Sequence, residues 1–120
     1  MTKEIKRKTI RDTIFDFRIV LQVCGDVKTF QRHLETSEKL NVPDNMVENS
    51  EGLFVDYGGM FAIWVSKPNA DLIAHEVAHA VNYVSTTLRI PTSDNNEFQS
   101  CYAAFLTGQI YSLAGLKWKY

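Results

Sequence analysis

The chain has 120 residues, of which 45% are hydrophobic, and a formal net charge of −1. This length is enough for one modest hydrophobic core, and the near-neutral charge gives no overall field that would attract nucleic acid or an anionic membrane. The two cysteines, Cys24 and Cys101, predict neither a disulfide framework nor a zinc knuckle. The N-terminus lacks the apolar stretch of a signal peptide, and no apolar run approaches a membrane span. We therefore expect one domain over residues 1–120, located in the cytoplasm, with both thiols free.

The first third of the chain predicts a leader, a strand and a helix. Residues 1–12 are locally basic and are expected to form a flexible leader or an early strand. A nucleic-acid-binding arm is the alternative, but no aromatic side chains are interleaved with the basic ones. Residues 15–23 alternate between apolar and polar side chains, which predicts a strand with one buried face. Asp26 is placed to cap a helix over residues 27–40, whose apolar stripe includes Phe30.

The middle of the chain predicts a loop followed by a β-hairpin. Residues 41–52 are mostly polar, as is typical of a loop. Two short apolar runs follow, residues 53–57 and 60–65, and Gly58-Gly59 joins them. The favoured two-residue turns need positive φ, which glycine adopts readily, so this pattern predicts a hairpin.

Two further helices are predicted in the last part of the chain. The first covers residues 70–88 and follows Asn69, a good N-cap residue. The second covers about residues 96–113 and follows the polar cap Asp94-Asn95-Asn96. The sequence therefore predicts an α+β fold, with a small, mainly antiparallel sheet packed on three helices.

A histidine motif lies on the predicted helix over residues 70–88, in the run His75-Glu76-Val77-Ala78-His79. Residues four apart share one face of a helix, so the imidazoles of His75 and His79 can reach one metal ion, with Glu76 close to a water on that metal. The apolar stripe of this helix lies on the opposite side, which argues against histidines that merely fill the core. The alternative interpretation is two solvated histidines with a surface glutamate between them.

A catalytic zinc site usually takes three protein ligands and leaves one position for water. Glu97, at the start of the last predicted helix, is the best candidate for the third ligand. Asp94 is an alternative that a capping role also explains, and His33 lies beside apolar residues, where a structural histidine is commoner. We also expect the stripe of small residues on the last helix to pack on or near the motif helix and to bring Glu97 to it. Besides Glu97, that stripe contains Cys101, Ala104 and Gly108.

The motif and the downstream segment Asn96-Glu97-Phe98-Gln99-Ser100 together resemble the gluzincin branch of the zincin metallopeptidases. The resemblance implies a minimal zincin-like (minigluzincin) domain with the motif on its second helix. It also implies one Zn²⁺ per chain, bound by His75, His79 and Glu97, with Glu76 as the catalytic general base.

One position departs from the family pattern. The family's aspartate that orients a ligand histidine falls at Cys101 in this chain. Such carboxylates fix the tautomer of the ligand and raise its basicity, so a backbone carbonyl or Asn82 would have to take over that role.

The function implied by the resemblance is hydrolysis of peptide bonds by a zinc-bound water that Glu76 activates. In the family, the strand before the metal-binding helix is an edge strand that pairs with an extended substrate, which implies that residues 60–65 bind a peptide or protein substrate. Tyr83, one turn past His79, is a candidate second electrophile or else an ordinary packed tyrosine. The chain is also similar to small stand-alone metallopeptidases predicted in tailed bacteriophages, which would act in the cytoplasm of a bacterial host.

The alternative function is a zincin-fold protein with little or no catalysis that binds a host or viral protein. The departure at Cys101 and the lack of a second lobe to enclose a substrate favour this alternative. The presence of Glu76 favours catalysis, because a structural zinc needs no carboxylate there. Neither a nucleic acid nor a membrane is expected as a partner.

Overall fold

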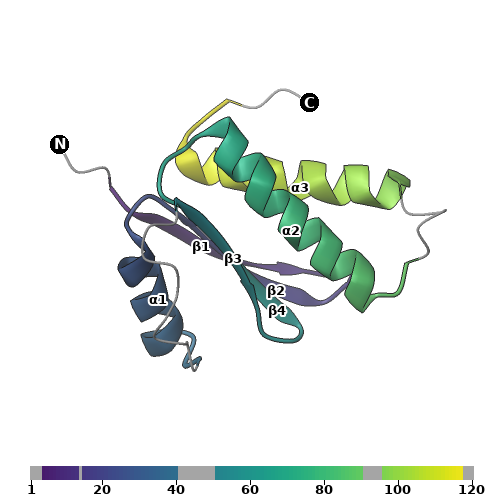
Figure 1. Ribbon diagram of the computed structural model, residues 1–120, viewed down its shortest axis with the longest axis horizontal. Coiled ribbons are helices and arrows are strands. Elements are labelled where there is room, and N and C mark those ends of the chain that lie inside the picture. The colour runs from purple at the N-terminus through teal and green to yellow at the C-terminus, as the bar shows by residue number, and fades with distance from the viewer. Residues whose placement is uncertain (1–3, 14, 41–50, 91–95, 118–120) are drawn as a thin grey trace.

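The computed structural model describes residues 4–13, 15–40, 51–90 and 96–117 (Figure 1). Four strands and three helices alternate irregularly along the chain, and the α+β class is confirmed. In chain order they are β1 (Lys6–Asp12), β2 (Phe17–Val23), α1 (Val27–Thr36), β3 (Gly52–Asp56), β4 (Met60–Val65), α2 (Ala70–Thr87) and α3 (Asn96–Ala114).

The strands form one sheet in the order β1-β2-β4-β3. β1 pairs with β2 and β3 pairs with β4 in antiparallel fashion, whereas β2 and β4 are parallel. The expectation that residues 60–65 form an edge strand is therefore wrong: β4 is paired on both sides, and β3 is the edge strand beside it. The physical reason is that all six residues of β4 are buried, as in a strand that is covered on both faces and paired on both sides.

The predicted hairpin between β3 and β4 is confirmed. Gly58 and Gly59 have φ values of 60° and 69°, and the amide of Tyr57 donates a hydrogen bond of 2.9 Å to the carbonyl of Met60. Two consecutive positive φ angles match the right-handed twist of the paired strands, which explains why two glycines close this turn.

The sheet is covered by helices on both faces: α1 packs on one, and α2 with α3 packs on the other (Figure 1). The prediction that β2 has a single buried face is wrong for this reason. Ile19 and Leu21 face α2 and α3, while Val20 faces α1, and all three are fully buried. Gln22, on the α1 side, is buried with its amide satisfied by the carbonyl of Cys24 (3.0 Å) and by the side chain of Arg7 (2.8 Å).

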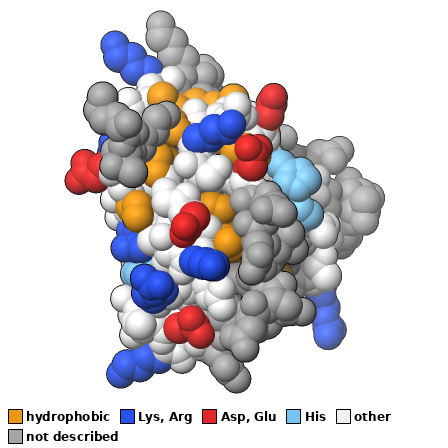
Figure 2. Space-filling model, turned by 60° about the vertical axis from the view of Figure 1, so that its left-hand side comes forward, with side chains coloured by type: hydrophobic (Ala, Val, Ile, Leu, Met, Phe, Trp, Pro, Cys, Tyr) orange, Lys and Arg blue, Asp and Glu red, His pale blue; other side chains and the backbone are white. Residues whose placement is uncertain are grey.

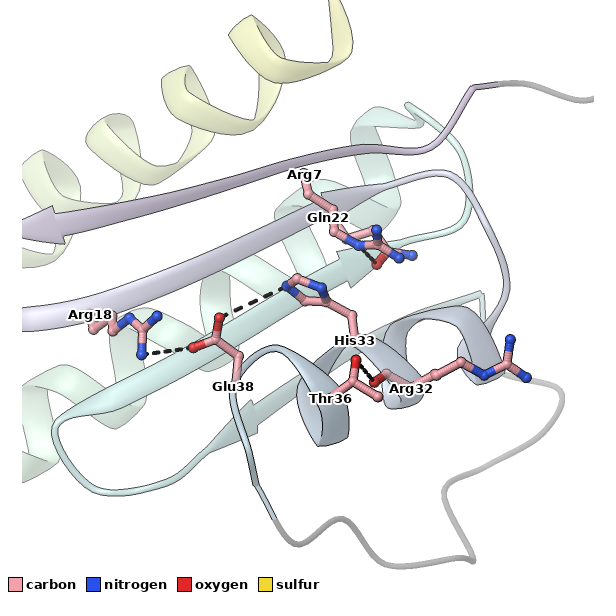
Figure 3. A network of polar contacts seen from close by, with 7 residues as sticks. All are labelled: Arg7, Arg18, Gln22, Arg32, His33, Thr36 and Glu38. Atoms are coloured by element: carbon pink, nitrogen blue, oxygen red, sulfur yellow. Dashed lines mark hydrogen bonds and ion pairs between the residues drawn. The ribbon is translucent and has the colours of Figure 1, made fainter.

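Helix α1 begins as predicted but ends earlier. Asp26 caps it by accepting hydrogen bonds from the amide and hydroxyl of Thr29 (2.8 and 2.7 Å), which lower the pKa of Asp26. The helix ends at Thr36, four residues before the predicted end, and Lys39 takes a positive φ of 56°. Just after the helix, Glu38 approaches Arg18 of β2 (Figure 3), which ties the end of α1 to the sheet.

Two further findings concern the whole of the described chain. Both cysteines are free, as predicted, and the structure places Cys24 in the interior and Cys101 at the surface. Among the described helices, none has the length and apolar character needed to cross a membrane.

Candidate metal centre

Helix α2 places the motif residues because its two sides are chemically different. Asn69 caps it by accepting hydrogen bonds from the amides of Asp71 (2.9 Å) and Leu72 (3.1 Å). One side of the helix is buried against the sheet and α3, which leaves His75 and His79 exposed on the other. The buried apolar residues are Ile73, Val77, Ala80, Val81 and Val84.

His75 and His79 converge on one point in space. Their Nε2 atoms lie 3.2 Å apart, and the ring centroids are 4.7 Å apart with the planes at 85°. Two zinc–nitrogen bonds of about 2.05 Å that span a 3.2 Å separation enclose an angle of about 100°, close to the tetrahedral value. The pair therefore fits two ligand positions of a zinc ion. Figure 2 shows histidine side chains open to solvent at the right-hand side of the view.

The ring of His79 is held by the edge strand of the sheet. Phe54 of β3 stacks on it, with centroids 6.3 Å apart and an interplanar angle of 18°. Phe54 itself packs against Phe61 (5.7 Å) and Tyr83 (5.8 Å). Sequence reasoning missed Phe54. The period-two alternation of the strand predicts that Leu53 and Phe54 face opposite sides, but only the register with Ile63 shows that Phe54 lies on the face that α2 covers.

Glu76 is buried beside the two exposed histidines, with only 5% of its surface accessible. Burial raises the pKa of its carboxyl group, and the nearby charges of His75 and His79 oppose that rise. A carboxyl group whose pKa is raised, placed next to two converging imidazoles, has the chemistry of a proton acceptor. Gly52 of β3 lies against this carboxylate, a contact that sequence reasoning also missed.

Tyr83 is half-buried in an aromatic cluster. Its ring lies 5.8 Å from that of Phe17, 5.8 Å from Phe54 and 6.1 Å from Phe61. These contacts explain the residue by packing alone, and a role as second electrophile stays a prediction.

Helix α3 faces α2 with other residues than predicted. A shallow cleft between the two helices is lined on the α3 side by Ser100, Ala103 and Thr107, together with Gln99. The predicted stripe is rotated by roughly 100° from this line, since each helical residue turns by about 100°. The reason is that Tyr102, Leu106 and Ile110 take the core face, which fixes the rotation of the helix.

The third ligand is not gathered with the histidine pair. Glu97 opens α3 and is exposed. Within the described ranges, no three histidine, cysteine, aspartate or glutamate side chains come together as a metal-binding group. Glu97 as a ligand therefore stays a prediction, and Asp94 lies outside the described residues.

The other candidates for the centre occupy different surroundings. His33 lies on α1, on the opposite face of the sheet, where its Nε2 is 3.9 Å from Glu38 (Figure 3). Cys101 lines a hollow between α3 and the β1–β2 turn. Asn82 is exposed and lines the cleft between α2 and α3. Only His75, Glu76 and His79, among the predicted site residues, are brought together by the described part of the chain.

Comparisons of the chain with protein-family models, with curated proteins and with solved structures found no match.

Proposed function

We propose that this chain is a zinc-dependent metallopeptidase with a minimal zincin-like fold, in which His75 and His79 bind the metal and Glu76 is the general base. One observation carries the proposal: two imidazole Nε2 atoms converge to 3.2 Å on the same helix as a buried glutamate. The convergence of two imidazoles beside a carboxyl group whose pKa is raised by burial is typical of a functional site, which supports the proposal. The third ligand proposed from the sequence is Glu97.

The chemistry divides between the metal and the chain. Zinc, when bound, supplies Lewis acidity and lowers the pKa of a water toward neutrality. Glu76 accepts the proton of the attacking water and passes it to the leaving amine. Phe54 holds the plane of His79 and so keeps its Nε2 directed at the metal position. Because β4 is paired on both sides, β3 is the edge strand next to this site among the described strands, and we place an extended peptide substrate along it.

The test is Glu76→Gln, which keeps the size of the side chain and removes the base. With zinc supplied, we expect wild type to cleave a peptide library and Glu76→Gln to lose activity by about 10³-fold, within the range that general-base catalysis contributes. Zinc content should be unchanged, because glutamine leaves both histidines in place. His79→Ala is the matched control and should lose zinc and activity together. Equal cleavage by wild type and Glu76→Gln would contradict the assignment.

A second function is favoured by one observation: the described residues bring together two histidines, and no third histidine, cysteine, aspartate or glutamate completes a metal-binding group there. A metal-binding or peptide-binding protein without hydrolysis fits this arrangement. It predicts that zinc-saturated wild type leaves every member of the library intact while retaining a subset of the peptides on the immobilised protein.

A further inference from the structure

Gly52 sits where the edge strand passes under the motif helix. The register pairs Gly52 with Val65 and Phe54 with Ile63, and Val65 and Ile63 both belong to the core on the α2 side of the sheet. Gly52 and Phe54 therefore point toward α2. The two residues meet different parts of the motif, because Phe54 stacks on His79 while Gly52 lies against Glu76.

The contact at Gly52 leaves no room for a side chain. A Cβ atom built there would lie 3.0 Å from Oε2 and 3.2 Å from Cγ of Glu76, and 3.2 Å from the carbonyl oxygen of Trp64. The Trp64 carbonyl belongs to the backbone of β4, so the group that can give way is the Glu76 side chain. A Cβ atom at this position would therefore press the Glu76 side chain away from its place by a few tenths of an ångström.

The conformation of the backbone does not require this glycine. Gly52 is absent from the residues with positive φ, whereas Gly58 and Gly59 have positive φ and would meet nothing within 4 Å if they carried a Cβ. In a strand, glycine is less favourable than alanine because it loses more conformational freedom on folding. Space, and not backbone geometry, is thus the reason for glycine at this position.

We propose that Gly52 is a positioning residue, whose missing side chain gives the carboxylate of Glu76 its place beside His75 and His79. The inference rests on the proposed function for the chemical role of the Glu76 carboxylate. The position of that carboxylate does not depend on the proposed function. Hydrolysis is sensitive to such placement, since a shift of about 1 Å in a reacting group can cost roughly a hundredfold in rate.

The first test is a double-mutant cycle in stability, carried out on the full chain with a chelator present so that neither zinc nor activity enters. In wild type, Gly52→Ala should lower the melting temperature by a few degrees, because the new methyl group meets Glu76. In the Glu76→Ala background the contact with the carboxylate is absent, so the same Gly52→Ala change should lower the melting temperature by less than it does in wild type. The clash with the Trp64 carbonyl is common to both backgrounds and cancels. An equal shift in both backgrounds would overturn the proposal.

The second test uses hydrolysis with saturating zinc. Gly52→Ala should reduce kcat by about threefold to tenfold with little change in KM or in zinc affinity, because the carboxylate shifts by less than 1 Å while the histidines and the β3 edge stay in place. A fall in kcat with unchanged zinc affinity supports the positioning role, and an unchanged kcat overturns it. If wild type cleaves nothing, the proposed function fails, and the stability cycle still decides whether Gly52 places Glu76.

Discussion

The helices on the two faces of the sheet both carry histidines, and their surroundings differ. His33, on α1, is largely covered and lies between Arg7 and Glu38, whose side chain is 4% exposed and also contacts Arg18 at 2.8 Å (Figure 3). On α2, His75 and His79 are exposed, and their Nε2 atoms have each other as neighbours. The first histidine lies beside a carboxylate, whereas the second arrangement brings two ring nitrogens within 3.2 Å of each other at the surface. Residue type alone therefore does not predict a metal site, and the convergence of ring nitrogens is what the metal-site prediction depends on.

The largest expected difference between the two histidine regions concerns the stability of the protein in the presence of zinc. At a zinc concentration about a hundredfold above its Kd, we expect the free energy of unfolding of wild type to rise by about 3 kcal/mol. His33→Ala should show the same increment, because His33 lies on the other face of the sheet, and His75→Ala should show almost none. Thermal unfolding with and without zinc measures all three. A zinc increment that disappears in His33→Ala would reverse the assignment of the two regions.

A smaller effect is expected at the strand that holds His79. Phe54→Ala removes a half-buried ring and should cost about 2 kcal/mol of stability. It should also weaken zinc binding by about tenfold, as the loss of groups that orient a metal ligand does. Leu53→Ala is the matched control, because Leu53 is equally half-buried on the same strand but faces α1. Isothermal titration of zinc into both variants compares their zinc affinities. Equal affinities would show that the stacking of Phe54 on His79 does not contribute to zinc binding.

The smallest effect concerns pH and the α1 face. Burial lowers the pKa of His33, Arg7 adds to the lowering, and Glu38 opposes it. A histidine with a lowered pKa contributes stability that is present above its ordinary pKa of about 6.5 and is lost as the pH falls through the lowered value. Denaturant unfolding at pH values from 7.5 to 5, in the absence of zinc, should therefore show a steeper loss of stability in wild type than in His33→Gln. Identical pH profiles would contradict the assignment of a partly buried histidine whose pKa is lowered.

Local sequence signals predicted much of the fold, and the errors concern the arrangement of elements that lie far apart in the sequence. The Asp26 and Asn69 caps and the Gly58-Gly59 turn depend on neighbouring residues only, and all three are confirmed. Strand order is not local, and the apolar run of residues 60–65 reads the same in an edge strand as in a central one, so β4 was misplaced.

For the candidate site too, features within one helix were predicted and contacts between elements were not. The convergence of His75 and His79 follows from their spacing on one helix, so the sequence was sufficient. The stripe on α3 was wrong because the core face of a helix sets its rotation, and here Tyr102, Leu106 and Ile110 take that face. Gly52 and Phe54 escaped notice because their partners, Glu76 and His79, lie on another element and meet them only through the register of β3 with β4.

The central claim is that His75 and His79 bind zinc, and metal content tests it most directly. Wild type, His79→Ala and Glu97→Ala would be purified side by side, offered zinc, desalted and measured by elemental mass spectrometry. The account predicts one zinc per chain in wild type, none in His79→Ala, and loss or marked weakening in Glu97→Ala if that residue is the third ligand. Wild type that retains no zinc would contradict the account and leave the two histidines as part of an ordinary helix surface.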